Sequence, residues 1–377
     1  MTALRVGVDL CRIDPAALRP ADHAVLDTLQ ATAGVGPDGV ELVLFASSAL
    51  RAARPSLFEA HEAHTLPFPP GVAVARLAAE AAWMRASARR AGIDLLHDAC
   101  GTSPVRPDVP TVVSVHDLRP FDRPKGIGRL RVAHHRHVVP RAVAGATAVT
   151  VPSGFARDRL VELFDVDAAK VSVVPWPLPP HEEAARIETV RARHGIIGQI
   201  VLLVGSTRAE EEHVVAVRAM RHLAARHKET TLVLLGPEGP AEARVAAEVE
   251  ALGLQDRVVR LGAVSSPVRS ALMEHAAVVV HPAVYGGFAD AVLEAMACGV
   301  PVVVADAGAG PELVADAGAV IPHGDDAQLA IEVHRVLDDP EWRRRMVAAG
   351  LQRARRYTAP ETAGALLATY RSVMVGL

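Results

Sequence analysis

The chain has 377 residues, more than one hydrophobic core of ordinary size supports, so we expect two domains. The formal net charge of −3 excludes a general nucleic-acid binder, which carries a basic excess. Three widely spaced cysteines form neither a metal-like pair nor a disulfide framework. No apolar run approaches the ~18 residues that span a bilayer, and the first apolar segment is too short for a signal peptide. We therefore expect a cytoplasmic protein.

Short apolar runs alternate with longer, alanine-rich amphipathic stretches, which is typical of a parallel sheet flanked by helices. In the first half we expect strands over Leu4–Leu10, Val40–Ala46, Leu95–His97, Thr111–Val115, Ala148–Val151 and Lys170–Val174. Between them we expect helices over Ala21–Ala33, Val72–Ala91, Ile127–Ala144 and Gly154–Phe164.

A proline-rich segment, Pro175-WPLPPHEE, interrupts this alternation and is expected to be a linker, because proline breaks helices and central strands. Strands then resume over Ile200–Val204, Thr231–Leu235, Val258–Leu261, Ala277–His281, Val302–Ala305 and Ala319–Ile321. An amphipathic helix is expected over Pro360–Met374. Two doubly wound halves imply a ligand site at the carboxyl ends of their strands.

The segment from Val278 to Val314 is the most informative part of the chain. It reads as a buried strand, a glycine-bearing loop, a short helix and a second buried strand. Asp290 is expected to be the N-cap of a helix over Ala291–Ala297. A strand that meets a helix N-terminus through a glycine turn offers an anion site, because free N–H groups and the helix dipole converge there.

This segment resembles the sugar-nucleotide site of family 4 glycosyltransferases, which usually reads S-x-x-E-G-F-G-x-x-x-x-E-A-M-A-x-G-x-P-V. The matching residues are Gly287, Phe288, Glu294, Ala295, Met296, Ala297, Gly299, Pro301 and Val302. The first Glu of the family's pair falls on Gly286. Weaker similarity extends over nearly the whole chain, from Val113–Phe121 to the closing Tyr357–Tyr370 helix.

The resemblance implies an α/β protein of the GT-B class, with two doubly wound Rossmann-like domains facing across a cleft. We expect an acceptor-binding domain over 1–177, a nucleotide-sugar-binding domain over 178–357, and a helix over 358–377 that crosses back to the first domain. The implied reaction is hexose transfer with retention of configuration, from a GDP- or UDP-hexose such as GDP-mannose to a saccharide or glycolipid acceptor. No metal cofactor is expected, since cationic side chains and helix N-termini can neutralise the leaving diphosphate.

The resemblance also implies residue roles. Glu294 is expected to accept hydrogen bonds from the donor's ribose hydroxyls, with a helix-surface glutamate as the alternative. The backbone N–H groups of Gly287, Phe288, Ala289 and Asp290 are expected to face the sugar and phosphates, with a tight turn required by the fold alone as the alternative. The expected donor-binding residues are Gly205, Ser206, Arg208, Tyr285, Gly286, Gly287, Phe288, Ala289 and Glu294.

Two residues are expected to take part in catalysis. His116 follows an apolar strand, where the family places a donor-contacting histidine; a neutral imidazole there can donate to a sugar hydroxyl or assist proton movement. Asp290 can reach the region that the missing glutamate serves, with an N-cap role as the alternative. Asp117 is expected to bind backbone at the strand end instead.

The chain also departs from the family where an Arg and a Lys usually hold the diphosphate. Those places fall on Glu210 and Glu211, and the Thr207–Glu210 spacing favours a capping box at a helix start. A like-charge pair at ~4 Å costs about 4 kcal/mol at an effective dielectric of 20, so glutamates cannot replace the cations. Arg208 is the nearest substitute, with a solvent-facing arginine as the alternative.

These departures leave a second function open, a non-catalytic GT-B protein that serves as a partner or scaffold. The sequence argues against a Rossmann dehydrogenase, because no G-x-G-x-x-G follows either opening strand. A helix rich in arginine and histidine begins at Arg129; it predicts a solvated face, with an anionic acceptor or a peripheral membrane contact as the alternative. A homodimer is also left open.

Overall fold

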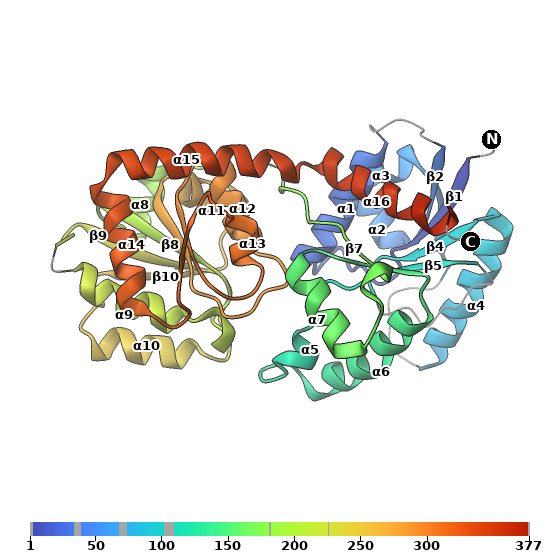
Figure 1. Cartoon of the computed structure of the whole chain (residues 1–377), viewed down its shortest axis with the longest axis horizontal. Helices are drawn as coiled ribbons and strands as arrows, with labels where there is room; N and C mark the ends of the chain where they lie inside the picture. The colour runs from blue at the N-terminus through green and yellow to red at the C-terminus, as the bar shows by residue number, and fades with distance from the viewer. Residues whose placement is uncertain are drawn as a thin grey trace. The chain divides into compact units, whose positions relative to one another are not determined.

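The computed structural model describes residues 3–33, 39–67, 74–101, 109–180, 182–224 and 226–375. The chain divides into two compact units (Figure 1). Unit 1 consists of Met1–Pro177 and Tyr357–Leu377, and unit 2 consists of Leu178–Arg356. Each unit has one parallel sheet with helices on both faces.

Unit 1 has a seven-stranded sheet in the order β3-β2-β1-β4-β5-β6-β7. The strands are β1 (Leu4–Asp9), β2 (Val40–Ser47), β3 (Glu62–Leu66), β4 (Leu95–Asp98), β5 (Thr111–Ser114), β6 (Ala148–Val151) and β7 (Val171–Val173). Because β1 pairs with both β2 and β4, the strand order reverses between β1 and β4.

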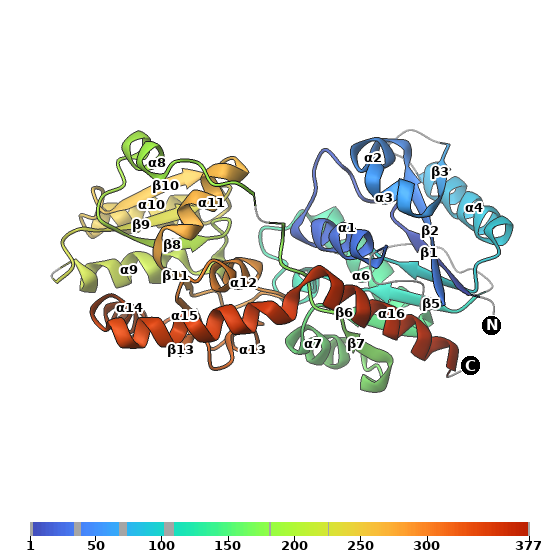
Figure 2. The same cartoon turned by 90° about the horizontal axis from the view of Figure 1, so that it is seen from above.

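Helices cover both faces of this sheet. They are α1 (Pro20–Thr32), α2 (Ser48–Ala53), α3 (Pro55–Ala60), α4 (Val74–Ala91), α5 (Arg119–Asp122), α6 (Arg129–Gly145), α7 (Gly154–Phe164) and α16 (Ala359–Val375). The C-terminal α16 packs beside α1 and buries Tyr370 in the same apolar cluster as Leu26 and Leu29 (Figure 2). The opposite face is closed by α4, whose Met84 packs in the cluster of Phe45.

Unit 2 has a six-stranded parallel sheet in the order β10-β9-β8-β11-β12-β13. Its strands are β8 (Gln199–Val204), β9 (Thr230–Leu235), β10 (Val258–Gly262), β11 (Ala276–His281), β12 (Val302–Ala305) and β13 (Ala319–Ile321). Its helices are α8 (Ile187–His194), α9 (His213–Leu223), α10 (Glu242–Ala251), α11 (Ser266–Glu274), α12 (Asp290–Ala297), α13 (Gly310–Val314), α14 (Asp326–Asp338) and α15 (Pro340–Ala354). Here the order reverses between β8 and β11, which are neighbours.

The central strands are short continuous runs of Val and Leu because helices cover them on both faces. All twelve predicted strands are present, each within one residue of its predicted ends. The helices predicted with both ends lie within two residues of their predicted ends, except that the start of the one predicted from Val72 lies outside the described residues. The helix start predicted at Thr207 is the exception described below. In unit 1, strand β3 and helices α2, α3 and α5 were not predicted. In unit 2, α12 is the one described helix that was predicted with both ends. Among the described helices, none is both long and apolar enough to cross a membrane.

Candidate functional site

The reversal of strand order in unit 2 brings three loops together at the carboxyl edge of the sheet. The loop after β8 joins the loop after β11 through a hydrogen bond of 2.8 Å from Val284 N to Glu210 O. The loop after β12 contacts the loop after β11, because Ala309 N donates to Gly286 O at 3.0 Å. Such a reversal is where open α/β sheets bind ligands, so the predicted donor residues of unit 2 lie at the expected place in the sheet.

The glycines of this edge differ in what they permit. Gly308 has φ +64°, and a Cβ there would lie only 2.9 Å from Gly286 N, so a side chain would collide with the β11 loop. A Cβ on Gly286 itself would meet nothing closer than Phe288 O, at 3.7 Å. The fold therefore requires glycine at 308, whereas the space beside Gly286 is open and could hold a side chain.

Helix α12 begins one residue earlier than predicted. Ala289 is its N-cap and Asp290 is its first residue, so the expected N-cap role of Asp290 is wrong. The Asp290 carboxylate instead accepts a hydrogen bond of 3.0 Å from Ala291 N. It therefore lies in the first helical turn, where its negative charge is favourable to the helix dipole.

Glu294 is held by an arginine that the sequence analysis did not identify. Arg269 on α11 donates from Nε to Glu294 Oε1 at 3.2 Å and from its Nη2 to Oε2. The Glu294 side chain is 15% exposed, which identifies a fixed, mostly buried carboxylate and not a free surface group. Burial alone lowers the pKa of Arg269, but Glu294 raises it above its ordinary value, so the pair is ionic.

The loop after β8 does not form the predicted capping box. Residues Ala209–Glu211 form a single 3-10 turn, Glu212 takes a left-handed conformation with φ 50°, and α9 begins only at His213. The Thr207 hydroxyl donates to Glu242 and accepts from Gly239 N at 2.7 Å, so it is not an N-cap. Competition from Glu242 explains why a correct local spacing gave the wrong helix start.

Charged side chains of both signs lie near the loop after β8. A Cβ on Gly205 would lie 2.9 Å from Glu211 Oε2, so this carboxylate is turned toward the end of β8. Arg260 is neutralised by Glu242, with Nε 3.0 Å from Oε1. Within the part of the chain that the structure describes, Arg208 forms no ion pair. It is therefore a cation that remains available to a bound anion.

Two histidines beside this loop were also missed. His213 is only 2% exposed, and no described residue lies in hydrogen-bonding geometry with either ring nitrogen. Burial lowers the pKa of His213 to about 4, with Arg260 adding to the effect. Burial likewise lowers the pKa of His281, opposed by Asp290. Both rings are therefore neutral near pH 7, and they add no cation to the site.

His116 lies in unit 1, just past β5, and both of its ring nitrogens are engaged there. Nε2 donates to Ala99 O at 3.1 Å, and Nδ1 accepts from Trp176 Nε1 at 3.2 Å. Burial lowers the pKa of His116 to about 4, opposed by the Ala99 hydrogen bond, so the ring is neutral. Direct donation to a sugar hydroxyl therefore requires His116 to release Ala99.

The neighbouring groups of His116 are structural. Asp117 accepts from Arg119 N at 2.9 Å and pairs with the Arg119 guanidinium, in the backbone-binding role expected of it. A cavity of about 30 Å³ adjoins the ring and is lined in part by His97 and Thr362. His97 bonds the Tyr370 hydroxyl at 2.7 Å, which ties α16 to β4.

Comparisons with known proteins indicate the family of the chain. A family model described as "Glycosyl transferases group 1" matches residues 187–353, and one described as "Glycosyltransferase Family 4" matches residues 28–181. The alpha-D-kanosaminyltransferase of Streptomyces kanamyceticus is 29% identical over 280 residues, 70% of this chain and 71% of that protein. The D-inositol 3-phosphate glycosyltransferase of Kineococcus radiotolerans is 31% identical over 298 residues, 70% of this chain and 66% of that protein.

Similarity in structure extends over both units. The crystal structure of Anabaena Alr3699/HepE in complex with UDP and glucose matches with a TM-score of 0.73 at 19% identity. The match covers 98% of this chain and 100% of that one. At this identity the match concerns the fold.

Proposed function

Since this chain belongs to glycosyltransferase family 4, we propose that it transfers a hexose, glucose or mannose, from a nucleotide donor to a saccharide or glycolipid acceptor. The GT-B fold, transfer with retention of configuration and the use of a nucleotide-sugar donor come with the family. The particular hexose, the acceptor and the residue roles are the proposal.

The observation that carries the donor site is the fixed carboxylate of Glu294. Two nitrogens of Arg269 hold it near the carboxyl edge of β11, so it is oriented before any ligand arrives. A carboxylate has about four acceptor positions, and Arg269 uses two of them. The remaining two can accept the vicinal hydroxyls of a ribose. Arg269 acts as a positioning residue, since it orients Glu294 without itself contacting the donor.

The diphosphate is proposed to lie between the N-terminus of α12 and Arg208. Backbone N–H groups and the helix dipole favour an anion at the start of α12. Arg208 adds a positive charge that no carboxylate of the described chain neutralises. Glu211 opposes binding, because its carboxylate faces the end of β8. We therefore expect weaker diphosphate binding than a site with two cations would give.

In the reaction, the bond between the sugar's anomeric carbon and the diphosphate oxygen breaks, and the acceptor oxygen bonds to the same face of that carbon. The acceptor's proton passes to the departing phosphate oxygen, so no oxidant or reductant is needed. The chain's part is to hold the donor and stabilise the charge that develops on the diphosphate. Asp290 and His116, whose ring is neutral, are each proposed to contact the sugar.

Two observations indicate which donors and which class of acceptor should be tested first. Because HepE holds UDP and glucose, UDP-glucose is the first donor to test, and GDP-mannose is the second. In unit 1, helix α6 carries four arginines and three histidines and no acidic residue. Its Leu130 is 88% exposed. This face suits an anionic acceptor or a glycolipid headgroup at a membrane surface.

The experiment is a thermal-shift screen of the full chain against UDP, GDP and ADP and their hexose derivatives. A ligand that binds only the folded state raises the melting temperature by mass action. The donor that raises it is then incubated with candidate acceptors, and the product's anomeric configuration is read by NMR. If no nucleotide sugar shifts the melting temperature and none is consumed, the proposal is wrong and a scaffold role replaces it.

A further inference from the structure

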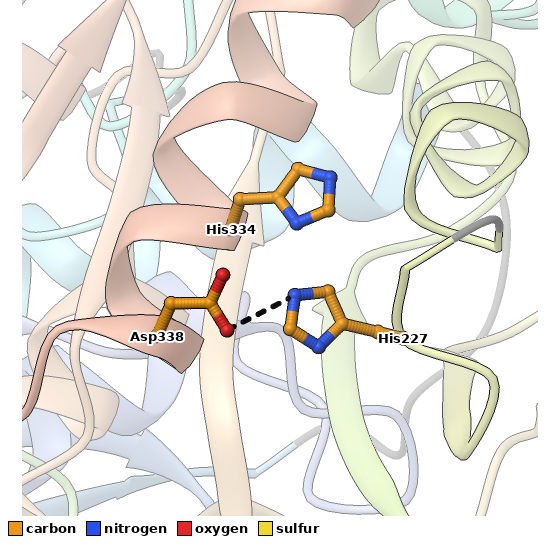
Figure 3. A group of neighbouring side chains, drawn as sticks. All are labelled: His227, His334 and Asp338. Carbon is orange, nitrogen blue, oxygen red and sulfur yellow. Dashed lines mark ion pairs between the residues drawn. The ribbon is translucent and has the colours of Figure 1, made fainter.

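A cluster of side chains of the kinds that bind metal ions lies in unit 2, at the end of the sheet opposite the proposed donor site. His227 follows α9 and precedes β9, so it lies near the amino ends of the strands. His334 and Asp338 are four residues apart near the end of α14, and therefore share one face of that helix. Helices α9 and α14 pack side by side, which brings the three residues together (Figures 1 and 3).

The three side chains converge on one small volume. One ligand atom from each lies within 4.8 Å of the other two. Figure 3 shows the rings of His227 and His334 and the Asp338 carboxylate turned toward one another. The contact from His227 Nε2 to Asp338 Oδ1 is 3.5 Å and is drawn as the dashed line. This contact is long for a hydrogen bond.

The two ring nitrogens that face the cluster are shielded from solvent but poorly satisfied. His227 Nε2 and His334 Nδ1 have no hydrogen-bond partner among the residues that the structure describes. A buried nitrogen without a partner lowers stability, and native proteins rarely retain one without a reason. Two such nitrogens beside one carboxylate are the donor set of a metal ion. We propose that His227, His334 and Asp338 bind a divalent transition-metal ion such as Zn²⁺.

The chemistry of the donors favours this class of ion. Two imidazoles and one carboxylate suit Zn²⁺, Co²⁺ or Ni²⁺, whereas Mg²⁺ and Ca²⁺ prefer oxygen ligands alone. Tetrahedral Zn²⁺ with bonds of about 2.0–2.1 Å needs donors about 3.4 Å apart. The ligand atoms lie within 4.8 Å of one another, so the cluster must contract by up to about 1.4 Å. His227 lies between α9 and β9 and Asp338 is the last residue of α14, so we expect these two side chains to make most of the adjustment. The fourth position would be taken by water.

The surroundings favour a cation. The cluster lies at the C-terminal ends of α9 and α14, where helix dipoles attract positive charge. Arg226 binds the other oxygen of Asp338 at 2.8 Å and fixes the carboxylate's orientation. Arg226 is 70% exposed, so its charge is largely screened by water. The metal would join the ends of two helices and take no part in sugar transfer.

The probe is Zn²⁺ alone, added to the tag-free, chelator-treated full chain in a calorimetric titration. We expect one saturable equivalent per chain and a higher melting temperature with Zn²⁺. His334→Ala and His227→Ala should each weaken binding at least tenfold, a loss found even for residues outside the ligand set. Co²⁺ should give the visible absorption of a tetrahedral site in the parent and lose it in both variants.

His222→Ala is the matched control. His222 lies on α9 and pairs with Asp326 of α14 at 3.0 Å, so the control removes a neighbouring histidine–carboxylate pair from the same two helices. It should leave Zn²⁺ affinity unchanged, and circular dichroism should show that every variant is folded. The proposal is overturned if the parent takes up no saturable equivalent, or if His222→Ala weakens binding as much as His334→Ala.

Discussion

Replacing Glu294 by alanine tests the donor site directly. The parent carboxylate is fixed by two nitrogens of Arg269 and is 15% exposed, so it needs no rearrangement to accept ribose hydroxyls. A hydrogen bond to a charged group contributes about 1.5–3 kcal/mol. We take this range for the whole vicinal pair, because both hydroxyls share one carboxylate. Glu294→Ala should then weaken nucleotide binding by about 10- to 150-fold.

The same change leaves Arg269 without its partner. The Arg269 side chain is 34% exposed, so water can solvate the freed charge and the loss of stability should be only about 1 kcal/mol. Arg269→Met separates the two effects: it removes the ion pair but keeps the carboxylate. This variant should lose similar stability while its nucleotide affinity falls less than that of Glu294→Ala.

The assay is calorimetric titration of the parent, both single variants and the double variant with the nucleotide diphosphate found in the screen. The step from Arg269→Met to the double variant measures the contribution of Glu294 without a stranded arginine. Melting temperatures report stability in parallel. Equal nucleotide affinity in the parent and a folded Glu294→Ala would remove Glu294 from the donor site.

Three further predictions concern the site and the buried histidines. His116→Ala should lower the rate of sugar transfer about 100-fold or more while nucleotide affinity stays unchanged. The control, Trp176→Phe, removes the same Trp176–His116 hydrogen bond and should retain most of the activity. Equal losses of activity in the two variants would show that His116 only stabilises the fold. Arg208→Ala should reduce transfer at least 100-fold and Glu211→Lys should tighten diphosphate binding, and a silent Arg208→Ala would exclude that residue. The folded pKa of His213, about 4, is below its unfolded value near 6.5, so the unfolded chain binds more protons and stability falls as the pH drops from 6.5 to 4. In denaturant unfolding, His213→Phe should reduce that fall by up to about 1.4 kcal/mol per pH unit; an unchanged slope would contradict the assignment.

The sequence predicted the strands whose residues form a clear apolar run. Central strands such as β8 and β12 are short runs of Val, Leu and Ile, so their local sequence alone indicates a buried strand. Strand β3 was missed because Glu62–Leu66 is an edge strand with only one buried residue and no apolar alternation. The helix start after β8 was placed wrongly because Thr207 is bound by Glu242, which lies far along the chain.

Within the candidate site, sequence reasoning found positions but not partners. Glu294 was found through its motif, whereas Arg269 belongs to another helix and no local pattern indicates that it faces α12. His116 was found from its place at a strand end. Its ring is neutral because the fold buries it, and its hydrogen-bond partners Ala99 and Trp176 come from either side of it along the chain. Long-range contacts of this kind are what one sequence without a structure does not reveal.

The contact between His97 and Tyr370 has a consequence for biosynthesis. Unit 1 is complete only when α16 packs beside α1, and the whole of unit 2 is translated before α16. Unit 2 is continuous in sequence, so it can fold as it leaves the ribosome. Most of unit 1 is synthesised earlier, and its apolar surface around Leu26 and Leu29 stays uncovered until α16 has been made. A nascent chain stalled or shortened before Tyr370 would therefore be a client for chaperones, although most of its residues were already made.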